Sequence, residues 1–228
     1  MPGRVSVIIP ALNEAESIGF VVGSQLWDEI AECIVVDNGS TDETALVAMT
    51  AGARVIRAPR GYGSAMRAGA GAASPSSDIL LFMDGDGSDV PADMPLLVGP
   101  IQRGEADFVL GSRLANREPG SMLASQVFAS HLISFLVRLF YGHRYSDMAS
   151  MRAIRREALE AMDMRERTYG WNLEMQIKAV RNGLRIAEVP VNYKRRIGGV
   201  SKVSGDFKAS VKAGFRILSV FLRVRREA

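Results

Sequence analysis

Apolar runs alternate with amphipathic segments along the first half of the chain. Five short runs are rich in Val, Ile, Leu or Phe: residues 5–9, 32–36, 54–57, 79–83 and 107–110. The segments between them have helical character: residues 15–26, 43–51, 64–73 and 92–103. Strands that alternate with helices predict an α/β fold, in which a mostly parallel sheet is flanked by helices.

Polar residues follow several of the predicted strands. Asn13 and Glu14 come after the first strand, Asp37 follows the second, and Asp84 and Asp86 follow the fourth. Continuous apolar runs indicate strands that are buried on both faces, and in such sheets ligands bind beyond the carboxyl ends of the strands. We therefore expect these polar residues to share one binding site.

The sequence Asp84-Gly85-Asp86 is the most informative of these groups. Two carboxylates this close repel each other and raise each other's pKa unless a cation lies between them. Mg²⁺ takes one or two protein carboxylates and completes its shell with water and substrate phosphates. The pair therefore predicts a metal site for a nucleotide diphosphate. The alternative is an acidic turn in which Gly85 and Gly87 supply the bend.

The second half of the chain holds two amphipathic segments. Polar residues recur at every fourth position of 123–140 and leave a broad apolar face, which suits a membrane, the sheet or a homodimer. Residues 206–223 combine an apolar side with a basic stripe, which is typical of helices that bind a lipid surface. We expect a catalytic domain over residues 1–205, a basic amphipathic helix and tail over 206–228, and peripheral membrane contact.

Charge and composition narrow the class of protein. From Lys194 onward there are ten Lys or Arg and two acidic residues, whereas the first 193 residues carry a net charge of −5. Such a tail can bind anionic lipid, nucleic acid or substrate phosphates, although a basic helix is often only a solvated face. Of these partners we expect no nucleic acid. Cys33 is the only cysteine, so no internal disulfide forms. We expect no signal peptide and no membrane-spanning helix, hence a cytoplasmic protein that can lie on the inner face of the membrane.

Several motifs, taken in order, resemble those of family 2 glycosyltransferases. The motifs of the first half are residues 5–14 (VSVIIPALNE), 35–42 (VVDNGSTD), 60–63 (RGYG), 83–86 (MDGD) and 111–113 (GSR). Those of the second half are Ser146-Asp147, Met151-Arg152, 171–174 (WNLE), 188–190 (EVP) and 199–202 (GVSK). The second set resembles the branch that contains dolichol-phosphate mannose synthase and polyprenyl-phosphate glycosyltransferases.

The resemblance implies a GT-A fold, a nucleotide-sugar donor, Mg²⁺ or Mn²⁺, and inversion at the anomeric carbon. It places Asp84 and Asp86 at the metal, and Arg113 near the transferred or accepting phosphate. The resemblance assigns the donor nucleotide to three further positions: Pro10, Glu14 and Asp37. We also place Gly61 at the nucleotide. Gly61 also belongs to a glycine loop that opens a helix, where free backbone N–H groups suit a phosphate.

The acceptor decides which further residues take part. A phosphate acceptor is already anionic, so it needs positioning by Arg113 and the loop of Arg195, Arg196 and Lys202, but no general base. A hydroxyl acceptor needs a base, for which Asp147 and Glu174 are the candidates.

Two positions depart from the family pattern. Ser88 stands where relatives often carry a metal-facing Gln, and residues 125–126 stand where relatives usually carry a basic side chain. We favour transfer of a hexose from a UDP- or GDP-sugar to a polyprenyl phosphate. The alternatives are transfer to a small soluble or glycan hydroxyl, and a non-catalytic sugar-nucleotide-binding protein at the membrane.

Overall fold

The computed structural model describes residues 4–198 and 219–224. Lys202, the proposed boundary between residues 205 and 206, and most of the predicted 206–223 helix lie outside these ranges. Residues 219–224 are helical. No helix in the described ranges is long and apolar enough to span a membrane.

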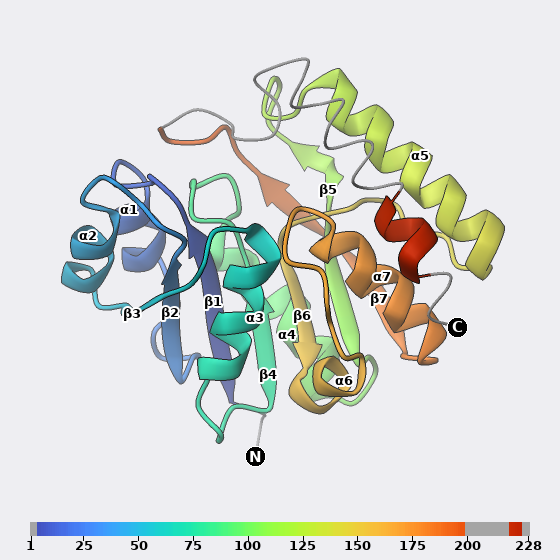
Figure 1. Ribbon diagram of the computed structural model, residues 1–228, viewed down its shortest axis with the longest axis horizontal. Coiled ribbons are helices and arrows are strands. Elements are labelled where there is room, and N and C mark those ends of the chain that lie inside the picture. Colours follow the sequence, from blue (N-terminus) through green and yellow to red (C-terminus); the bar gives the residue numbers. More distant parts are fainter. Residues whose placement is uncertain (1–3, 199–218, 225–228) are drawn as a thin grey trace.

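Seven strands form one twisted sheet at the centre of the described structure (Figure 1). They are β1 (Val5–Ala11), β2 (Glu32–Asp37), β3 (Arg54–Arg57), β4 (Ile79–Phe82), β5 (Phe108–Arg117), β6 (Arg152–Arg155) and β7 (Ile186–Tyr193). Their order across the sheet is β3-β2-β1-β4-β6-β5-β7. Only β6 pairs antiparallel, with β4 on one side and β5 on the other. The mostly parallel sheet predicted from the alternating pattern is confirmed.

Helices pack on both faces of this sheet. They are α1 (Ile18–Gly23), α2 (Thr44–Thr50), α3 (Tyr62–Ala72), the 3-10 helix η1 (Pro91–Asp93), α4 (Met94–Gln102), α5 (Ala124–Tyr141), α6 (Arg156–Ala161) and α7 (Trp171–Arg181). Successive residues of a strand point to opposite faces. Accordingly, Ile8 belongs to the core beneath α3 and α7, while its neighbours Val7 and Ile9 belong to the core beneath α1 and α4.

This topology brings the polar strand ends together. In the register of β1 and β2, Ala11 lies opposite Asp37, and β4 runs parallel to β1 on its other side. The residues that follow these three strands therefore emerge at one edge of the sheet, at the top of Figure 1. The expected elements are present, most of them with small shifts at their ends: β1 continues through Pro10 to Ala11, and α1 begins at Ile18 rather than at residue 15. The largest difference is in β5, which was expected to end at residue 110 and continues to Arg117.

Candidate active site

The loop that follows β4, residues 84–89, is folded around its own carboxylates, and we call it the acidic loop. The Asp84 backbone N–H donates to Asp89 Oδ2 at 2.9 Å. The Ser88 backbone N–H and hydroxyl both donate to Asp86 Oδ1, at 2.9 and 2.5 Å. Ser88 therefore orients Asp86. Sequence reasoning missed Asp89, although a third carboxylate five residues after Asp84 was a visible signal.

The acidic loop concentrates negative charge where little water reaches it. Burial raises the pKa of Asp84 to about 8, and the charges of Asp89 and Asp86 add to this effect. Burial likewise raises the pKa of Asp89 to about 6, with a further contribution from Asp86. A divalent cation would relieve this repulsion, because an opposite charge favours the ionised form of each carboxyl.

The donor set of the loop fits Mg²⁺ or Mn²⁺. Asp84 and Asp86 offer hard carboxylate oxygens, which these ions prefer. Within residues 4–198 and 219–224, no three His, Cys, Asp or Glu side chains form a group that could hold a metal. Two carboxylates with water and substrate phosphates make up the shell that Mg²⁺ usually adopts, so the ion would depend on the substrate for part of its coordination.

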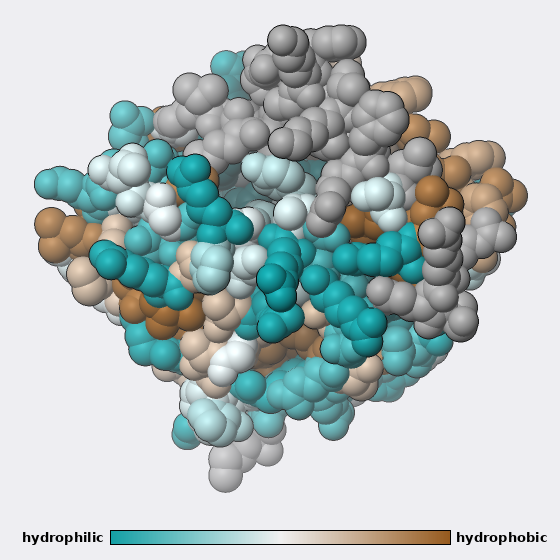
Figure 2. All heavy atoms as spheres, viewed as in Figure 1, coloured by the Kyte–Doolittle hydropathy of each residue, from teal (hydrophilic) through white to brown (hydrophobic). Residues whose placement is uncertain are grey.

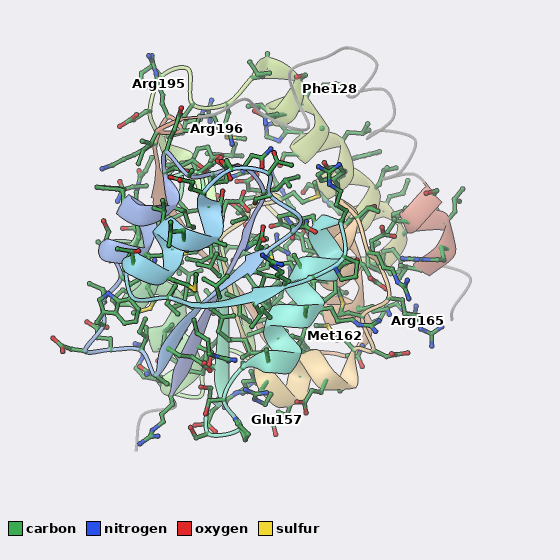
Figure 3. The ribbon with its side chains drawn as sticks, turned by 60° about the vertical axis from the view of Figure 1, so that its left-hand side comes forward. Phe128, Glu157, Met162, Arg165, Arg195 and Arg196 are labelled. Atoms are coloured by element: carbon green, nitrogen blue, oxygen red, sulfur yellow. The ribbon has the colours of Figure 1, made fainter. Side chains whose placement is uncertain are left out.

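Arg196 reaches this loop from the segment that follows β7. Its Nη2 lies 2.6 Å from Asp86 Oδ2 and 3.9 Å from a carboxylate oxygen of Glu14. Backbone bonds fix the segment: Lys194 N–H donates to the Ser88 carbonyl at 2.9 Å, and Ile197 N–H donates to the Asp86 carbonyl at 3.0 Å. Arg196, which is labelled in Figure 3, therefore lies beside the predicted metal ligand Asp86.

Arg195 points elsewhere. Its Nε and Nη2 donate to the Pro119 carbonyl at 2.9 and 2.6 Å, so it braces the loop after β5. Arg195 and Arg196, two of the three residues predicted to bind the acceptor phosphate, therefore have different partners. The third, Lys202, lies outside the described residues. Of the two in view, only Arg196 contacts the acidic loop.

The predicted nucleotide residues line the ends of β1 and β2. Asp37 is buried, and its Oδ1 accepts the Ser40 N–H at 2.9 Å. Glu14 is also buried, and the hydroxyl of neighbouring Ser17 donates to the Gly85 carbonyl at 2.9 Å. This bond ties the turn after β1 to the acidic loop. Pro10, within β1, lies beside Gly85, because a Cβ on that glycine would meet the Pro10 carbonyl oxygen at 3.4 Å.

The glycine loop, residues 60–64, is tightly covered, and this corrects the expectation of free N–H groups for a phosphate. The Gly63 N–H donates to the Thr168 carbonyl at 3.2 Å, and the Ser64 N–H donates to the Arg167 carbonyl at 3.0 Å. A Cβ at Gly61 would lie 2.3 Å from the Arg167 carbonyl oxygen. Close packing accounts for these glycines. Gly61 still borders the end of β2, since its N–H donates to the Asn38 side chain at 3.0 Å.

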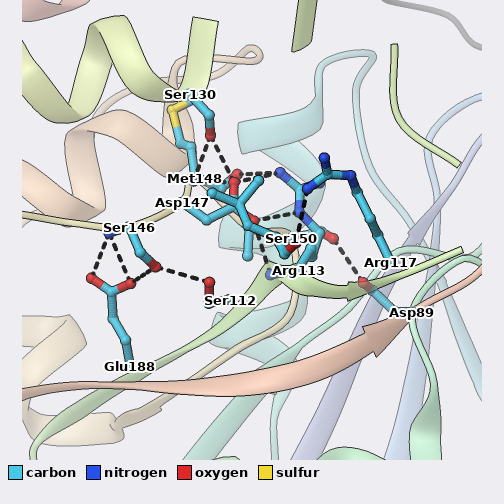
Figure 4. Close-up of polar contacts among 12 residues, drawn as sticks. Asp89, Ser112, Arg113, Arg117, Ser130, Ser146, Asp147, Met148, Ser150 and Glu188 are labelled. Atoms are coloured by element: carbon cyan, nitrogen blue, oxygen red, sulfur yellow. Dashed lines mark hydrogen bonds and ion pairs between the residues drawn. The ribbon is translucent and has the colours of Figure 1, made fainter. Parts of the chain in front are cut away.

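Arg113 and Asp147 form a two-point ion pair (Figure 4). Arg113 Nε lies 2.8 Å from Asp147 Oδ2, and its Nη2 lies 3.0 Å from Oδ1. The guanidinium also lies over the Tyr193 ring, 5.0 Å from the ring centre. Burial alone would raise the pKa of Asp147, but the hydrogen bonds and charge of Arg113 lower it to about 2. A carboxylate held in this way is a poor base, so the general-base role considered for Asp147 is not supported.

Asp147 also connects the site to α5 and α7. The Ser130 hydroxyl, on α5, donates to Asp147 Oδ1 at 2.7 Å, and Gln176, on α7, donates to its backbone carbonyl at 3.0 Å. Asp147 is therefore a positioning residue for Arg113. Ser130 was not predicted, because nothing in the helical pattern separates a buried serine with a charged partner from one that faces solvent.

Glu174 is fully buried, which argues against the role of general base that was expected for a hydroxyl acceptor. Its carboxylate accepts the N–H groups of Arg165 at 3.1 Å and Glu166 at 2.6 Å, and lies 3.0 Å from Lys178 Nζ. These contacts hold the segment that covers the glycine loop. The geometry supports a structural role for Glu174 rather than proton transfer.

Comparison with known proteins gives consistent results. Residues 6–162 match the family described as glycosyl transferase family 2. An uncharacterized glycosyltransferase of Mycobacterium tuberculosis is 40% identical over 92% of this chain and 94% of its own. An undecaprenyl-phosphate mannosyltransferase of Micrococcus luteus is 34% identical over 89% of this chain and 88% of its own.

Solved structures share the fold. Glucosyl-3-phosphoglycerate synthase of Mycobacterium tuberculosis, crystallised with Mn²⁺, UDP-glucose and phosphoglyceric acid, superposes with a TM-score of 0.78 at 27% identity. The match covers 97% of this chain and 79% of that one. The GT-A architecture expected from the sequence motifs is thereby confirmed.

Proposed function

This chain belongs to glycosyl transferase family 2, and we propose that it transfers a hexose from a UDP- or GDP-sugar to a polyprenyl phosphate, with inversion at the anomeric carbon. One observation supports a phosphate rather than a hydroxyl group as the acceptor. Both carboxylates that were candidates for the base of a hydroxyl acceptor, Asp147 and Glu174, are engaged in buried ion pairs. A phosphate acceptor needs no such base.

The donor would lie across the carboxyl ends of β1, β2 and β4. Asp37 and Glu14 border the nucleotide, and Asp84 and Asp86 would hold the Mg²⁺ or Mn²⁺. A bound divalent ion would act as a Lewis acid that neutralises charge developing on the departing nucleoside diphosphate. Arg196 would have to exchange its contact with Asp86 for substrate phosphate, a change that the charge of a bound ion would favour.

Arg113 is the proposed contact for the acceptor phosphate. Its Nε and Nη2 are committed to Asp147, which fixes the plane of the guanidinium, and 13% of the side chain remains exposed. A fixed, permanently charged guanidinium can orient a phosphate oxygen for attack on the anomeric carbon. The undecaprenyl-phosphate mannosyltransferase relative supports a lipid-linked phosphate as that acceptor.

A phosphorylated soluble acceptor is the second candidate. The solved glucosyl-3-phosphoglycerate synthase holds phosphoglyceric acid, and its match covers most of this chain. In addition, the first turn of α5 lacks the basic residue usual in the polyprenyl-phosphate branch. Gln126 instead accepts the Leu123 N–H at 2.8 Å and caps the helix.

The surface of α5 supports peripheral membrane contact. Phe128, Phe135 and Leu139 are 69%, 59% and 62% exposed, and with Leu132 they lie at helical spacing on one side. Figure 2 shows hydrophobic side chains at the edge of the molecule where α5 lies, and Figure 3 shows Phe128 on its outer side. No Asp or Glu occurs between Glu118 and Asp147. An apolar helix face without acidic residues suits an anionic leaflet.

A transfer assay tests the proposed function. The protein is incubated with Mg²⁺ and radiolabelled UDP-glucose or GDP-mannose, together with either undecaprenyl phosphate or 3-phosphoglycerate. We expect label in the organic phase with one of the donors and only when the lipid is present. Labelled product confined to the aqueous phase with 3-phosphoglycerate would establish the second candidate instead.

A further inference from the structure

The segment from Arg165 to Gly170 lies over the glycine loop at backbone contact distance. Two N–H groups of the loop donate to carbonyls of this segment, and a Cβ at Gly63 would lie 2.2 Å from the Glu166 carbonyl oxygen. Gly61, in the same loop, donates to Asn38 at the end of β2. The position of residues 165–170 therefore fixes the position of the glycine loop beside the proposed nucleotide site.

Two buried carboxylates, Glu174 and Glu166, fix the backbone of the 165–170 segment by hydrogen bonds. Glu174 accepts backbone N–H groups from Arg165 and Glu166. The Glu166 side chain folds back onto the same segment, where its Oε1 accepts the Thr168 N–H at 2.9 Å and the Thr168 hydroxyl at 2.5 Å. Both carboxylates are almost completely excluded from solvent. Buried anions of this kind require cations close by.

One of these cations comes from the far end of the chain. Arg223, on the helix at 219–224, places Nη2 3.0 Å from Glu166 Oε2 and 3.8 Å from Glu174 Oε1. Val220, on the same helix, packs so closely on Gly170 that a Cβ there would lie 2.5 Å from it. The helix thus contacts both ends of the 165–170 segment.

The same short helix is anchored on two further elements. Phe221 packs edge-on against Phe140 and Tyr141 at the end of α5, with ring centres 5.2 and 5.8 Å apart. Arg181, in the last turn of α7, donates to the Val224 carbonyl at 2.7 Å. Figure 1 shows this helix beside α5 and α7. These described residues of the tail are part of the packed structure.

We propose that the C-terminal helix completes the donor site, with Arg223 as a positioning residue for the nucleotide. Arg223 neutralises Glu166 and Glu174, the two carboxylates hold the 165–170 segment, and that segment holds Gly61 against Asn38. The chain of contacts is continuous from residue 223 to the end of β2. The proposal rests on the nucleotide-sugar donor of the proposed function, but not on the identity of its acceptor.

Hydrogen exchange and nucleotide binding together test this role in the full-length protein. Arg223→Gln removes the charge, Arg223→Lys retains it, and Leu222→Ala is the control, because Leu222 is 45% exposed on the same helix. The amides of Gly63 and Ser64 report on the glycine loop. Isothermal titration with UDP and with GDP, each in Mg²⁺, reports on the site without any acceptor.

We expect Arg223→Gln to accelerate exchange at Gly63 and Ser64 about tenfold and to weaken binding of the preferred nucleotide by a similar factor, as for loss of one charge-assisted hydrogen bond. Arg223→Lys should keep the exchange rate and the nucleotide affinity close to those of the wild type. Leu222→Ala should change neither of these quantities. Unchanged exchange at Gly63 and Ser64 in a folded Arg223→Gln protein would refute the proposal, as would unchanged nucleotide affinity. If the wild type binds neither nucleotide, the proposed function fails before this inference is reached.

Discussion

Arg113 and Asp147 meet through two parallel hydrogen bonds, 2.8 and 3.0 Å long, across the junction of β5 and the loop before β6. Only 1% of the Asp147 side chain is exposed. A buried carboxylate with an arginine on both oxygens orients that arginine. Asp147 is therefore the support of the proposed acceptor contact rather than a base, and two predictions depend on this pair.

Asp147→Asn should destabilise the protein by about 3 to 5 kcal/mol, because it removes one partner of a buried ion pair and leaves the other charge behind. Urea unfolding measures the loss. The control is Asp163→Asn, whose partner Arg165 is largely exposed, as is Asp163 itself. This control should leave the midpoint almost unchanged. An equal loss of stability in both variants would show that the buried Arg113–Asp147 pair contributes no more to stability than the exposed pair.

The same pair predicts an acid limit to stability. The pKa of Asp147 is about 2 in the folded protein, below the value of about 4 expected when unfolded. Its contribution is therefore fully present above about pH 4 and is lost as the pH falls towards 2. The difference in melting temperature between wild type and Asp147→Asn should be constant from pH 5 to 7 and shrink below pH 4. A difference that stays constant down to pH 2.5 would contradict the low pKa.

Metal binding should strengthen with pH. Without metal the pKa of Asp84 is about 8, so an ion that uses this carboxylate must displace its proton at neutral pH. Affinity for Mg²⁺ or Mn²⁺ should rise up to about tenfold per pH unit between pH 6 and 8. Isothermal titration with Mn²⁺ and UDP measures it. Asp86→Ala should abolish the part of UDP binding that depends on Mn²⁺. An affinity for the metal that does not change with pH would argue against Asp84 as a ligand.

Two glycines of α3 offer a matched pair for the glycine loop. Gly63→Ala forces a Cβ within 2.2 Å of the Glu166 carbonyl oxygen, whereas Gly71→Ala meets nothing within 4 Å. Gly63→Ala should lower the free energy of unfolding by about 1 to 3 kcal/mol, because the added methyl group overpacks this contact. The second should stabilise the helix by up to about 1 kcal/mol. Thermal unfolding of both variants measures these changes. An unchanged melting temperature for Gly63→Ala would show that the 165–170 segment moves away from the new Cβ at little cost.

The parts of the site that depend on strand ends were predictable from the sequence. A parallel sheet delivers the residues after each strand to one edge, so Glu14, Asp37, Asp84 and Asp86 could be placed together from the apolar runs alone. Gly61 also lies near this edge, since its N–H donates to the Asn38 side chain. The packing of the glycine loop was not predictable, because the carbonyls that contact it come from residues more than 100 positions away.

Tertiary contacts determined the rest. Glu174 has the spacing of an exposed helical residue, and only the fold shows that backbone N–H groups and Lys178 surround it. The antiparallel strand β6 is four residues long and carries two arginines, so its pattern did not stand out. Ser130 and Arg223 acquire their roles from partners distant in sequence, which a pattern of local periodicity does not reveal.

The central claim is that the sugar is transferred to a phosphate oxygen, and ³¹P NMR of the product tests it most directly. The wild-type protein is incubated with Mg²⁺, undecaprenyl phosphate and the donor that supports turnover. We predict that the phosphomonoester signal of the lipid is replaced by a phosphodiester signal in step with release of the nucleoside diphosphate. Donor consumption with the monoester signal unchanged, and the sugar recovered on a hydroxyl group, would contradict the account.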